Sequence, residues 1–381
     1  MPKKHEIRIN RRKPQSEEPG TGHNRWHPDV PPIIKIEPGD TVIMETRDAL
    51  DGGITRKTTS NGLTRLELGT IHPLTGPVYV NGAEPGDLLE VNILKIEPQS
   101  FGFTSIIPGF GILRDYFLKP FLVKWSIEGN FAISQEIPGV RIPGAPFMGV
   151  MGVAPSHGMV ERITAREAEL VTRGGMVFPP SAQAAVPASG PAALEGLRTI
   201  PPRENGGNTD IKQMTEGTTI YYAVYTPGAL FSAGDAHFAQ GDGESCGTAI
   251  ETGATLTVRF NLLKGKATQL HQRSLHFERR GHRPSKRNPD AQRFYAVTGL
   301  PIRADGVNES EDVTLASKNA LLNMIDHLVA EYGYSREQAY ALTSITVNLH
   351  ISELVDVPNV LVSAFLPLDI FVKRSKFANL A

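Results

Sequence analysis

The stretch Thr255-Leu256-Thr257-Val258-Arg259-Phe260 alternates polar and apolar side chains. This alternation is typical of a β-strand with one face against a core, and it predicts that Leu256, Val258 and Phe260 are buried on that face. Residues 219–225, rich in aromatic and β-branched side chains, predict a second strand. The middle of the chain is therefore expected to be sheet.

Further strands are predicted nearer the N-terminus. Residues 33–36 and 41–44 are separated by Pro38-Gly39-Asp40, and a second Pro-Gly-Asp sequence at 85–87 precedes a strand over 88–96. Pro and Gly in this order mark turns, so both sites predict related hairpins. Residues 1–30 are polar and carry several basic side chains, which predicts an N-terminal arm that is solvated or contacts another subunit.

Two segments dense in Gly and Pro interrupt the strands. Residues 101–160 predict long ordered loops rather than helices, apart from a short helix at 164–169 that follows them. Residues 174–207 are rich in Pro, Ala and Gly and predict a surface excursion with one short helix near 192–197.

The last third of the chain has helical spacing. Residues 315–332 carry an apolar stripe of Leu321, Leu322, Ile325, Leu328 and Val329. Ser335 and Gln338 form a capping-box signature for a second helix, and residues 361–372 return to a strand pattern. The predicted class is β-rich α+β, with an arm at 1–30, a β body at 31–262 and an α+β portion at 263–381.

The composition limits the possible functions. The 381 residues carry a net charge of −1, which gives no electrostatic reason to expect nucleic acid or a membrane surface as a partner. The single cysteine, Cys246, excludes an intrachain disulfide, and no run of about 18 apolar residues occurs. With no signal-peptide pattern at the N-terminus, a cytoplasmic location is expected.

The densest chemical signal lies at residues 235–251, between the two strands described first. This segment holds two Asp, one His, two Glu and one Cys. On an extended backbone Asp235 and His237 would point to the same face, where a carboxylate and an imidazole suit zinc or a similar ion. Such an ion lowers the pKa of water to about 7, and a nearby Glu could act as general base. On spacing alone, a surface hairpin around Asp242-Gly243 is the stronger interpretation.

Other residues offer competing chemistry. Gly243-Glu244-Ser245-Cys246-Gly247 formally matches a nucleophile elbow, but a strand rather than a helix is expected after it, which argues against a serine nucleophile. Cys246 could be a thiol nucleophile only with an adjacent base. Asp48 follows a predicted strand end, and His72 could line a pocket from its loop.

Several segments, taken in order, resemble the acetamidase/formamidase family. The central one runs from Gly234-Asp235-Ala236-His237 to Glu251, and residues 72–87, 137–156 and 206–212 agree as well. The resemblance covers about residues 24–371 and is nearer to the longer, formamidase branch. It implies a β-sandwich-like body, a homo-oligomer and a divalent metal, often zinc.

The resemblance also implies a function. It is hydrolysis of the C–N bond of a small non-peptide amide, with release of ammonia. Carried over, Asp48, Asp235 and His237 become the metal ligands, and Glu244 and Glu251 the candidate general bases. A cyclic amide such as a γ-lactam would present the same polarised carbonyl and is an alternative substrate. A non-catalytic β-sandwich protein that binds small amides is the alternative from another class.

Overall fold

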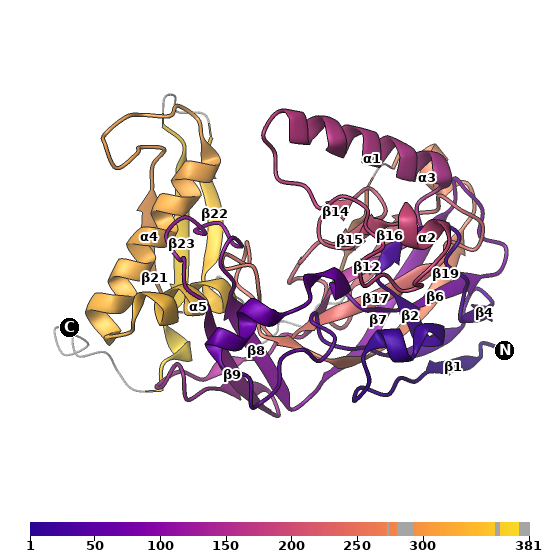
Figure 1. Cartoon of the computed structure of the whole chain (residues 1–381), viewed down its shortest axis with the longest axis horizontal. Helices are drawn as coiled ribbons and strands as arrows, with labels where there is room; N and C mark the ends of the chain where they lie inside the picture. The colour runs from indigo at the N-terminus through magenta and orange to yellow at the C-terminus, as the bar shows by residue number, and fades with distance from the viewer. Residues whose placement is uncertain (273, 280–292, 355–358, 373–381) are drawn as a thin grey trace.

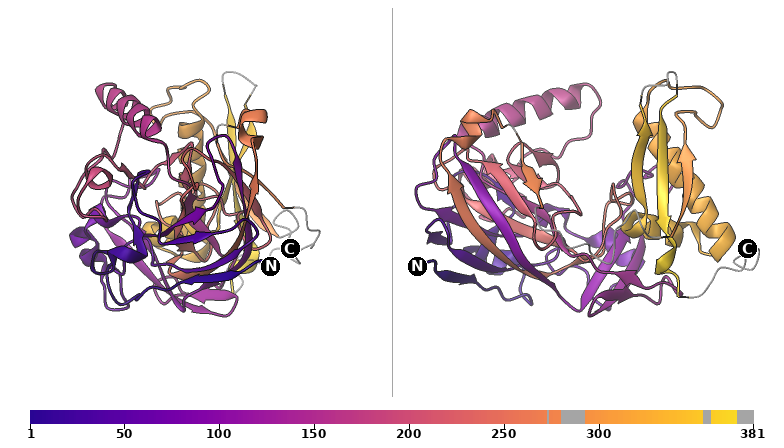
Figure 2. Two further views of the ribbon diagram at one scale, coloured as in Figure 1. Left: turned by 90° about the vertical axis from the view of Figure 1, so that its right-hand side faces the viewer. Right: turned by 180° about the vertical axis from the view of Figure 1, so that it is seen from behind.

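The computed structural model describes residues 1–272, 274–279, 293–354 and 359–372. A large sheet-rich body lies beside a smaller lobe formed by the C-terminal part of the chain (Figure 1). The view from behind shows the same two parts, with the helix and strands of the lobe standing next to one end of the body (Figure 2). The predicted β-rich α+β class is confirmed.

One sheet of the body has six strands among the described residues. Its order is β1 (Lys4–Ile7), β5 (Thr41–Glu45), β19 (Ala254–Leu263), β7 (Leu88–Pro98), β16 (Thr219–Ala223) and β20 (His276–Glu278). Leu256, Val258 and Phe260 on β19 are fully buried, as their alternation predicts.

The second sheet has twelve strands in the described part of the chain. Its main path is β11 (Ile142–Pro143), β10 (Phe131–Ile133), β9 (Phe121–Glu128), β8 (Phe101–Ile106), β18 (Glu251–Thr252), β17 (Phe231–His237), β12 (Phe147–Gly152), β15 (Gly206–Asn208) and β14 (Pro202–Arg203). Three further strands complete the sheet. β6 (Leu74–Val80) pairs with β17, and β2 (Gly22–His23) and β4 (Ile34–Ile36) both pair with β6. A short ladder joins β3 (Arg25–Trp26) to β13 (Leu197–Arg198).

The two sheets share a core. Val42 and Leu256 from the six-stranded sheet belong to the same buried apolar cluster as Met148 and Phe231 from the twelve-stranded sheet. Apolar faces that meet in this way are the basis of a sandwich. Strand β17 is buried along its whole length, so any polar side chain that it carries is removed from water.

The C-terminal lobe pairs one sheet with two helices. Its strands are β21 (Phe294–Gly299), β23 (Leu361–Pro367) and β22 (Asn348–Glu353), and its helices are α4 (Val313–Tyr332) and α5 (Arg336–Thr346). The predicted capping box is present at the start of α5. Leu321 and Tyr340 share a buried cluster with Ile106 and Trp125, so the lobe packs on β8 and β9.

The two Pro-Gly-Asp turns have the same internal structure. The Asp40 carboxylate accepts a hydrogen bond from the backbone N–H of Glu37 at 3.1 Å, and Asp87 accepts one from Glu84 at 2.9 Å. The intervening Gly39 and Gly86 have φ of 98° and 95°, which glycine adopts without strain. The two turns are therefore related, but the prediction of hairpins is wrong. Each turn leads from one sheet to the other, because β4 and β6 belong to the twelve-stranded sheet whereas β5 and β7 belong to the six-stranded sheet.

Three segments differ from the sequence predictions. The arm at 1–30 is not a solvated tail, since β1 joins the six-stranded sheet and Arg25 and Trp26 are buried. Residues 101–160 contain β8 to β12 rather than loops alone. The helix expected at 164–169 extends over α1 (His157–Thr172).

The excursion at 174–207 is only partly at the surface. It contains the expected short helix as α2 (Pro191–Leu194), but Val186, Ala193 and Leu197 are buried. The guanidinium of Arg25 donates to the carbonyls of Ser181 and Gln183, which ties the excursion to β3. Backbone acceptors thus replace the carboxylate that a buried cation usually requires.

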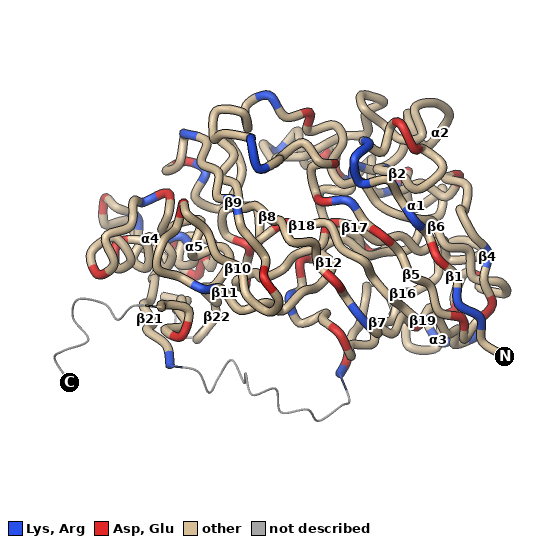
Figure 3. Tube along the Cα trace, turned by 90° about the horizontal axis from the view of Figure 1, so that it is seen from below, with Lys and Arg blue, Asp and Glu red and all other residues tan. Residues whose placement is uncertain are grey.

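The division expected after residue 262 falls before α3 (Lys266–Gln269) and β20. Because β20 pairs with β16, the sheet of the body continues to Glu278. Within the described ranges, no helix combines the length and apolar character needed to cross a membrane. Basic and acidic residues are interspersed along the trace in both parts of the molecule (Figure 3).

Candidate functional site

Strands β17 and β18 bring three of the predicted site residues together. His237 on β17 is the direct cross-strand partner of Glu251 on β18. Asp235 lies two residues before His237, and its Oδ1 is 3.4 Å from His237 Nε2. The prediction that Asp235 and His237 share a face is therefore confirmed. The hairpin interpretation was correct in topology: the connection is at the surface at Gly243, but the strands that carry Asp235, His237 and Glu251 are buried.

Three buried atoms of this group converge without hydrogen-bond partners. They are Asp235 Oδ1, His237 Nε2 and Glu251 Oε2, with His237 Nε2 3.1 Å from Glu251 Oε2. Buried polar atoms in proteins are almost always satisfied, so three such atoms at one point indicate a missing charged partner. Two carboxylate oxygens and one imidazole nitrogen are suitable ligands for a divalent ion of the zinc type.

Gln240 determines which nitrogen of His237 is free. Its Nε2 donates to the backbone carbonyl of Asp210 at 2.8 Å, which turns its Oε1 towards His237. That Oε1 lies 2.8 Å from His237 Nδ1 and accepts the proton that Nδ1 carries. In the neutral imidazole the lone pair is then on Nε2, directed at Asp235 and Glu251. The structure therefore has the hydrogen bond that usually supports a metal-bound histidine.

A second acidic pair surrounds the same imidazole. Asp210 Oδ1 lies 3.8 Å from His237 Nδ1, and Glu244 Oε1 lies 3.9 Å from His237 Nε2. Asp210, His237 and Glu244 also satisfy the spacing of metal ligands. Because Nδ1 is engaged by Gln240, the set with Asp235 and Glu251 fits a cation better.

The backbone around the acids is held in an uncommon conformation. Asp210, Asp235 and Glu244 have φ of 49°, 55° and 41°, in the left-handed region that non-glycine residues rarely adopt. Gly149 on the neighbouring strand makes room for them, since a Cβ there would lie 2.6 Å from Asp210 Oδ1 and 2.7 Å from Asp235 Oδ2. Strain and close approach together indicate a site whose geometry is imposed by the surrounding fold.

Burial and mutual charge shift the titration of the group. Burial, together with neighbouring carboxylates, raises the pKa of Glu244 and of Glu251 to about 8, against the opposing effect of His237. Burial alone would lower the pKa of His237, but Glu251 and Asp235 overcome it and raise that pKa well above its usual value. The pKa of Asp235 is lowered because His237 and His72 outweigh its burial. A divalent cation at this point would compete with the proton on His237 for the same lone pair.

A cavity of about 210 Å³ opens beside the group. Asp235, Glu244 and Glu251 form its acidic end, and its other walls are largely apolar. The apolar lining includes Leu50, Leu68, Ile71, Phe103, Phe110 and Ile200. The space suits a small molecule with one polar group and excludes a folded polypeptide.

His72 lines the cavity, as its loop position suggested. Its Nε2 lies 3.8 Å from Asp235 Oδ2, and its backbone N–H donates to the Thr199 hydroxyl. Burial lowers the pKa of His72, with Asp235 opposing the shift. A neutral imidazole at the wall of the cavity can donate or accept one hydrogen bond.

Asp48 is not brought into either of the two groups. Its Oδ1 accepts hydrogen bonds from the backbone N–H groups of Leu50, at 2.9 Å, and Gly52, at 3.2 Å. Burial and the charge of Asp235 raise its pKa. Asp48 therefore supports the cavity wall at Leu50, while the described cluster places Glu251 with Asp235 and His237 instead.

Within the part of the chain that the structure describes, neither alternative nucleophile is hydrogen-bonded to a basic side chain. The Ser245 hydroxyl is buried 3.3 Å from the Thr343 hydroxyl. Cys246 contacts the Ser105 and Thr248 carbonyls through Sγ, and burial raises the pKa of its thiol to about 11. A neutral thiol of this kind is a poor nucleophile.

Sequence reasoning did not identify Asp210, Gln240 or Gly149 as site residues. Asp210 and Gly149 were quoted only within segments of the family resemblance, because nothing in a linear sequence shows that they approach β17. Gln240 follows His237 by three residues. That spacing brings the two side chains together only because the chain turns after β17, which the run of Gly residues could have suggested.

Comparisons with known proteins identify relatives along nearly the whole chain. Residues 8–373 match the Acetamidase/Formamidase family. A formamidase of Methylophilus methylotrophus is 34% identical over 96% of the chain and 93% of its own length, and an acetamidase of Mycolicibacterium smegmatis is 36% identical over 84% of each. The solved structure of a gamma lactamase from Delftia acidovorans has a TM-score of 0.91, with 34% identity over 97% of this chain and 94% of that chain.

Proposed function

The chain belongs to the acetamidase/formamidase family, and from this premise we propose that it hydrolyses a small linear amide of the formamide type and releases ammonia. It is an amidase that acts on C–N bonds other than peptide bonds, as its relatives are. This assignment rejects the alternative function, a non-catalytic protein that only binds small amides.

The observation that carries the proposed site is the convergence of three unpaired buried atoms at one end of the small cavity. Asp235, His237 and Glu251 would hold a divalent ion, proposed to be zinc. When bound, such an ion polarises the amide carbonyl and lowers the pKa of water. In this proposal Glu251 takes the place expected for Asp48, and Glu244 is left as the general base.

Glu244 is suited to move the proton. It lines the cavity, and burial raises the pKa of its carboxyl to about 8, so it can accept and return a proton near neutral pH. It takes a proton from the water whose oxygen attacks the amide carbon. It then gives that proton to the nitrogen as the C–N bond breaks, which leaves a carboxylic acid and ammonia.

The cavity selects for small substrates. His72 lines the cavity close to Asp235 and can hydrogen-bond the amide, while Ile71 and Phe103 form part of the apolar wall. About 210 Å³ accommodates formamide or acetamide with water. Larger acyl groups would collide with the apolar walls.

A γ-lactam is the second candidate substrate. The observation that favours it is the TM-score of 0.91 with the gamma lactamase, together with an apolar wall that could pack against a ring. Ring opening would use the same steps, except that the nitrogen stays attached to the product. A homo-oligomer and a cytoplasmic location, both expected from the sequence, remain part of the proposal.

A substrate panel combined with metal removal tests the function. Formamide, acetamide and a γ-lactam are offered to the protein, and ammonia or ring-opened product is measured before and after exhaustive chelation. We expect ammonia from a linear amide, loss of the rate on chelation and recovery with Zn²⁺. An unchanged rate after chelation contradicts the metal role. Inactivation by a thiol reagent would then favour Cys246 as the nucleophile.

A further inference from the structure

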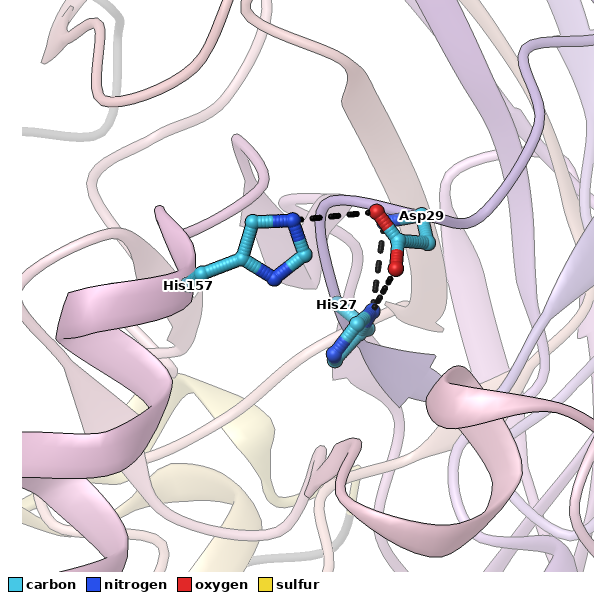
Figure 4. Close-up of side chains that lie close together, drawn as sticks. All are labelled: His27, Asp29 and His157. Carbon is cyan, nitrogen blue, oxygen red and sulfur yellow. Dashed lines mark hydrogen bonds and ion pairs between the residues drawn. The ribbon is translucent and has the colours of Figure 1, made fainter.

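A second group of histidine and carboxylate side chains lies outside the cavity. His27 and Asp29 follow β3, and His157 is the first residue of α1. Figure 4 shows both imidazoles close to the Asp29 carboxylate, with His157 reaching it from the first turn of the helix. None of the three residues lines the cavity described above.

The ligand atoms of the group are close enough to share one ion. His157 Nε2 is 3.1 Å from Asp29 Oδ1, and His27 Nδ1 is 3.8 Å from Asp29 Oδ2. The two imidazole rings lie edge to face, 5.3 Å apart. One atom from each residue lies within 4.8 Å of the others, as metal ligands require.

His27 is already in the state that a metal ligand needs. The backbone N–H of Asp29 donates to His27 Nδ1 at 3.2 Å, so Nδ1 carries a lone pair and the proton of the neutral ring is on Nε2. The lone pair therefore faces Asp29 and His157. An ion at this point would replace one long hydrogen bond with a stronger interaction.

The other side of the His27 ring indicates the same role. The side chain is 1% exposed, and its Nε2 is buried without a hydrogen-bond partner. The carboxylate of Glu195 lies on this side, with its Oε2 4.0 Å from that nitrogen. A carboxylate behind the free nitrogen of a histidine is the usual support for a metal-bound imidazole. A small closing movement of Glu195, which is exposed at the end of α2, would complete it.

We propose that His27, Asp29 and His157 form a second divalent-metal site, distinct from the catalytic cluster. Two imidazole nitrogens and one carboxylate favour an ion of the zinc class over Mg²⁺ or Ca²⁺, which prefer oxygen ligands alone. Asp29 and His157 are 44% and 63% exposed, so water completes the coordination.

The site would join parts of the chain that are far apart in sequence. The segment after β3, the start of α1 and, through Glu195, the end of α2 meet there. An ion at this point cross-links them in the folded state and not in the unfolded state, which stabilises the fold by mass action.

Metal counting on the full chain, without a polyhistidine tag, tests the proposal. Wild type, His157→Ala and Asp29→Asn are dialysed against a buffered excess of free Zn²⁺, and bound zinc per chain is measured. His276→Ala is the matched control, because His276 is also an exposed histidine but lies on β20. The side chains changed in the test variants are 63% and 44% exposed, so the fold should be retained.

We expect wild type and His276→Ala to bind one more zinc per chain than His157→Ala and Asp29→Asn. Titration should show at least tenfold weaker binding at this site in both test variants, and Co²⁺ absorption should lose one component. Equal stoichiometry and affinities within twofold between wild type and His157→Ala would overturn the proposal. Equal loss in His276→Ala would overturn it too, because it would show general binding to surface histidines. All four proteins have the same catalytic cluster, so its metal content affects neither result.

Discussion

The central cluster (Asp235, His237 and Glu251) and the peripheral cluster (His27, Asp29 and His157) are both built from histidine and carboxylate side chains but differ in burial. Asp235, His237 and Glu251 are at most 3% exposed, whereas Asp29 and His157 are 44% and 63% exposed. Water screens the charges at the periphery, while the central charges must satisfy one another. Burial thus separates a site that can do chemistry from one that can only bind.

The pKa values of His237 and His27 are shifted in opposite directions. At the centre, Glu251 and Asp235 overcome burial and raise the pKa of His237. At the periphery, burial of His27 is stronger than the attraction of Asp29 and Glu195 and, with the charge of His157, lowers its pKa. The two carboxylates that raise the pKa of His237 lie 3.1 and 3.4 Å from its ring, whereas the two beside His27 lie at 3.8 and 4.0 Å, so the closeness of the carboxylates decides which imidazole holds a charge.

The largest expected effect comes from removing the proposed base. Glu244→Gln should lower kcat/KM for the amide by about 10²–10⁴-fold, because general acid–base catalysis contributes that much. Asp29→Asn at the periphery should leave kcat/KM within twofold. Steady-state ammonia release measures both, with circular dichroism to confirm folding. Comparable losses of kcat/KM in the two variants would contradict the assignment of catalysis to the central cluster and of binding alone to the peripheral one.

A buried histidine without carboxylates should respond to pH in the opposite way to His237. Burial lowers the pKa of His23 to about 4, against the Arg25 carbonyl that accepts from its Nδ1. In the unfolded chain this histidine binds a proton at about pH 6.5. The free energy of unfolding therefore decreases by about 3 kcal/mol as the pH falls from 6.5 to below 4.

Denaturant unfolding at several pH values measures this loss. The free energy of unfolding of His23→Asn should fall less steeply between pH 6.5 and 4 than that of wild type, because the titrating group is gone. Parallel curves for the two proteins would show that His23 is not a source of acid sensitivity.

The smallest effect is expected at the support of His237. Gln240→Leu removes the acceptor at Nδ1 while keeping the side-chain size, and should cost about 10–100-fold in zinc affinity or activity. Gln269→Leu, at an exposed position of α3, is the control and should be silent. If Gln240→Leu binds zinc as tightly as wild type, Nδ1 needs no acceptor and the preference for Asp235 and Glu251 loses its basis.

Local patterns predicted the elements that depend on neighbours in sequence. The alternation at 255–260 identified the buried face of β19, and Ser335 and Gln338 identified the start of α5. The period of two also placed Asp235 beside His237. The polar sequence of β1 was misleading because an edge strand of this kind turns Lys4 and Glu6 to solvent while its backbone pairs with β5.

The rest of the site depends on contacts that no local pattern encodes. Glu251 joins the cluster through the register of β17 against β18, which a turn of thirteen residues does not specify. Asp210 and Glu244 turn inward from left-handed backbone that other residues impose on them. Gly149 contributes to the site by leaving space for the neighbouring carboxylates. A glycine in a sequence does not show which side chains will occupy the space beside it.

The hydrogen bond between His72 and Thr199 has a consequence for how the protein folds. It joins residues 127 positions apart, whereas the hairpin of β17 and β18 closes within a short stretch. Contacts between distant residues form slowly because the chain must first give up the freedom of the intervening loop. The pairing of β17 with β18 is therefore expected to form before the wall of the cavity that carries His72. Recovery of enzymatic activity would report the completed fold, whereas recovery of sheet content would report only its beginning.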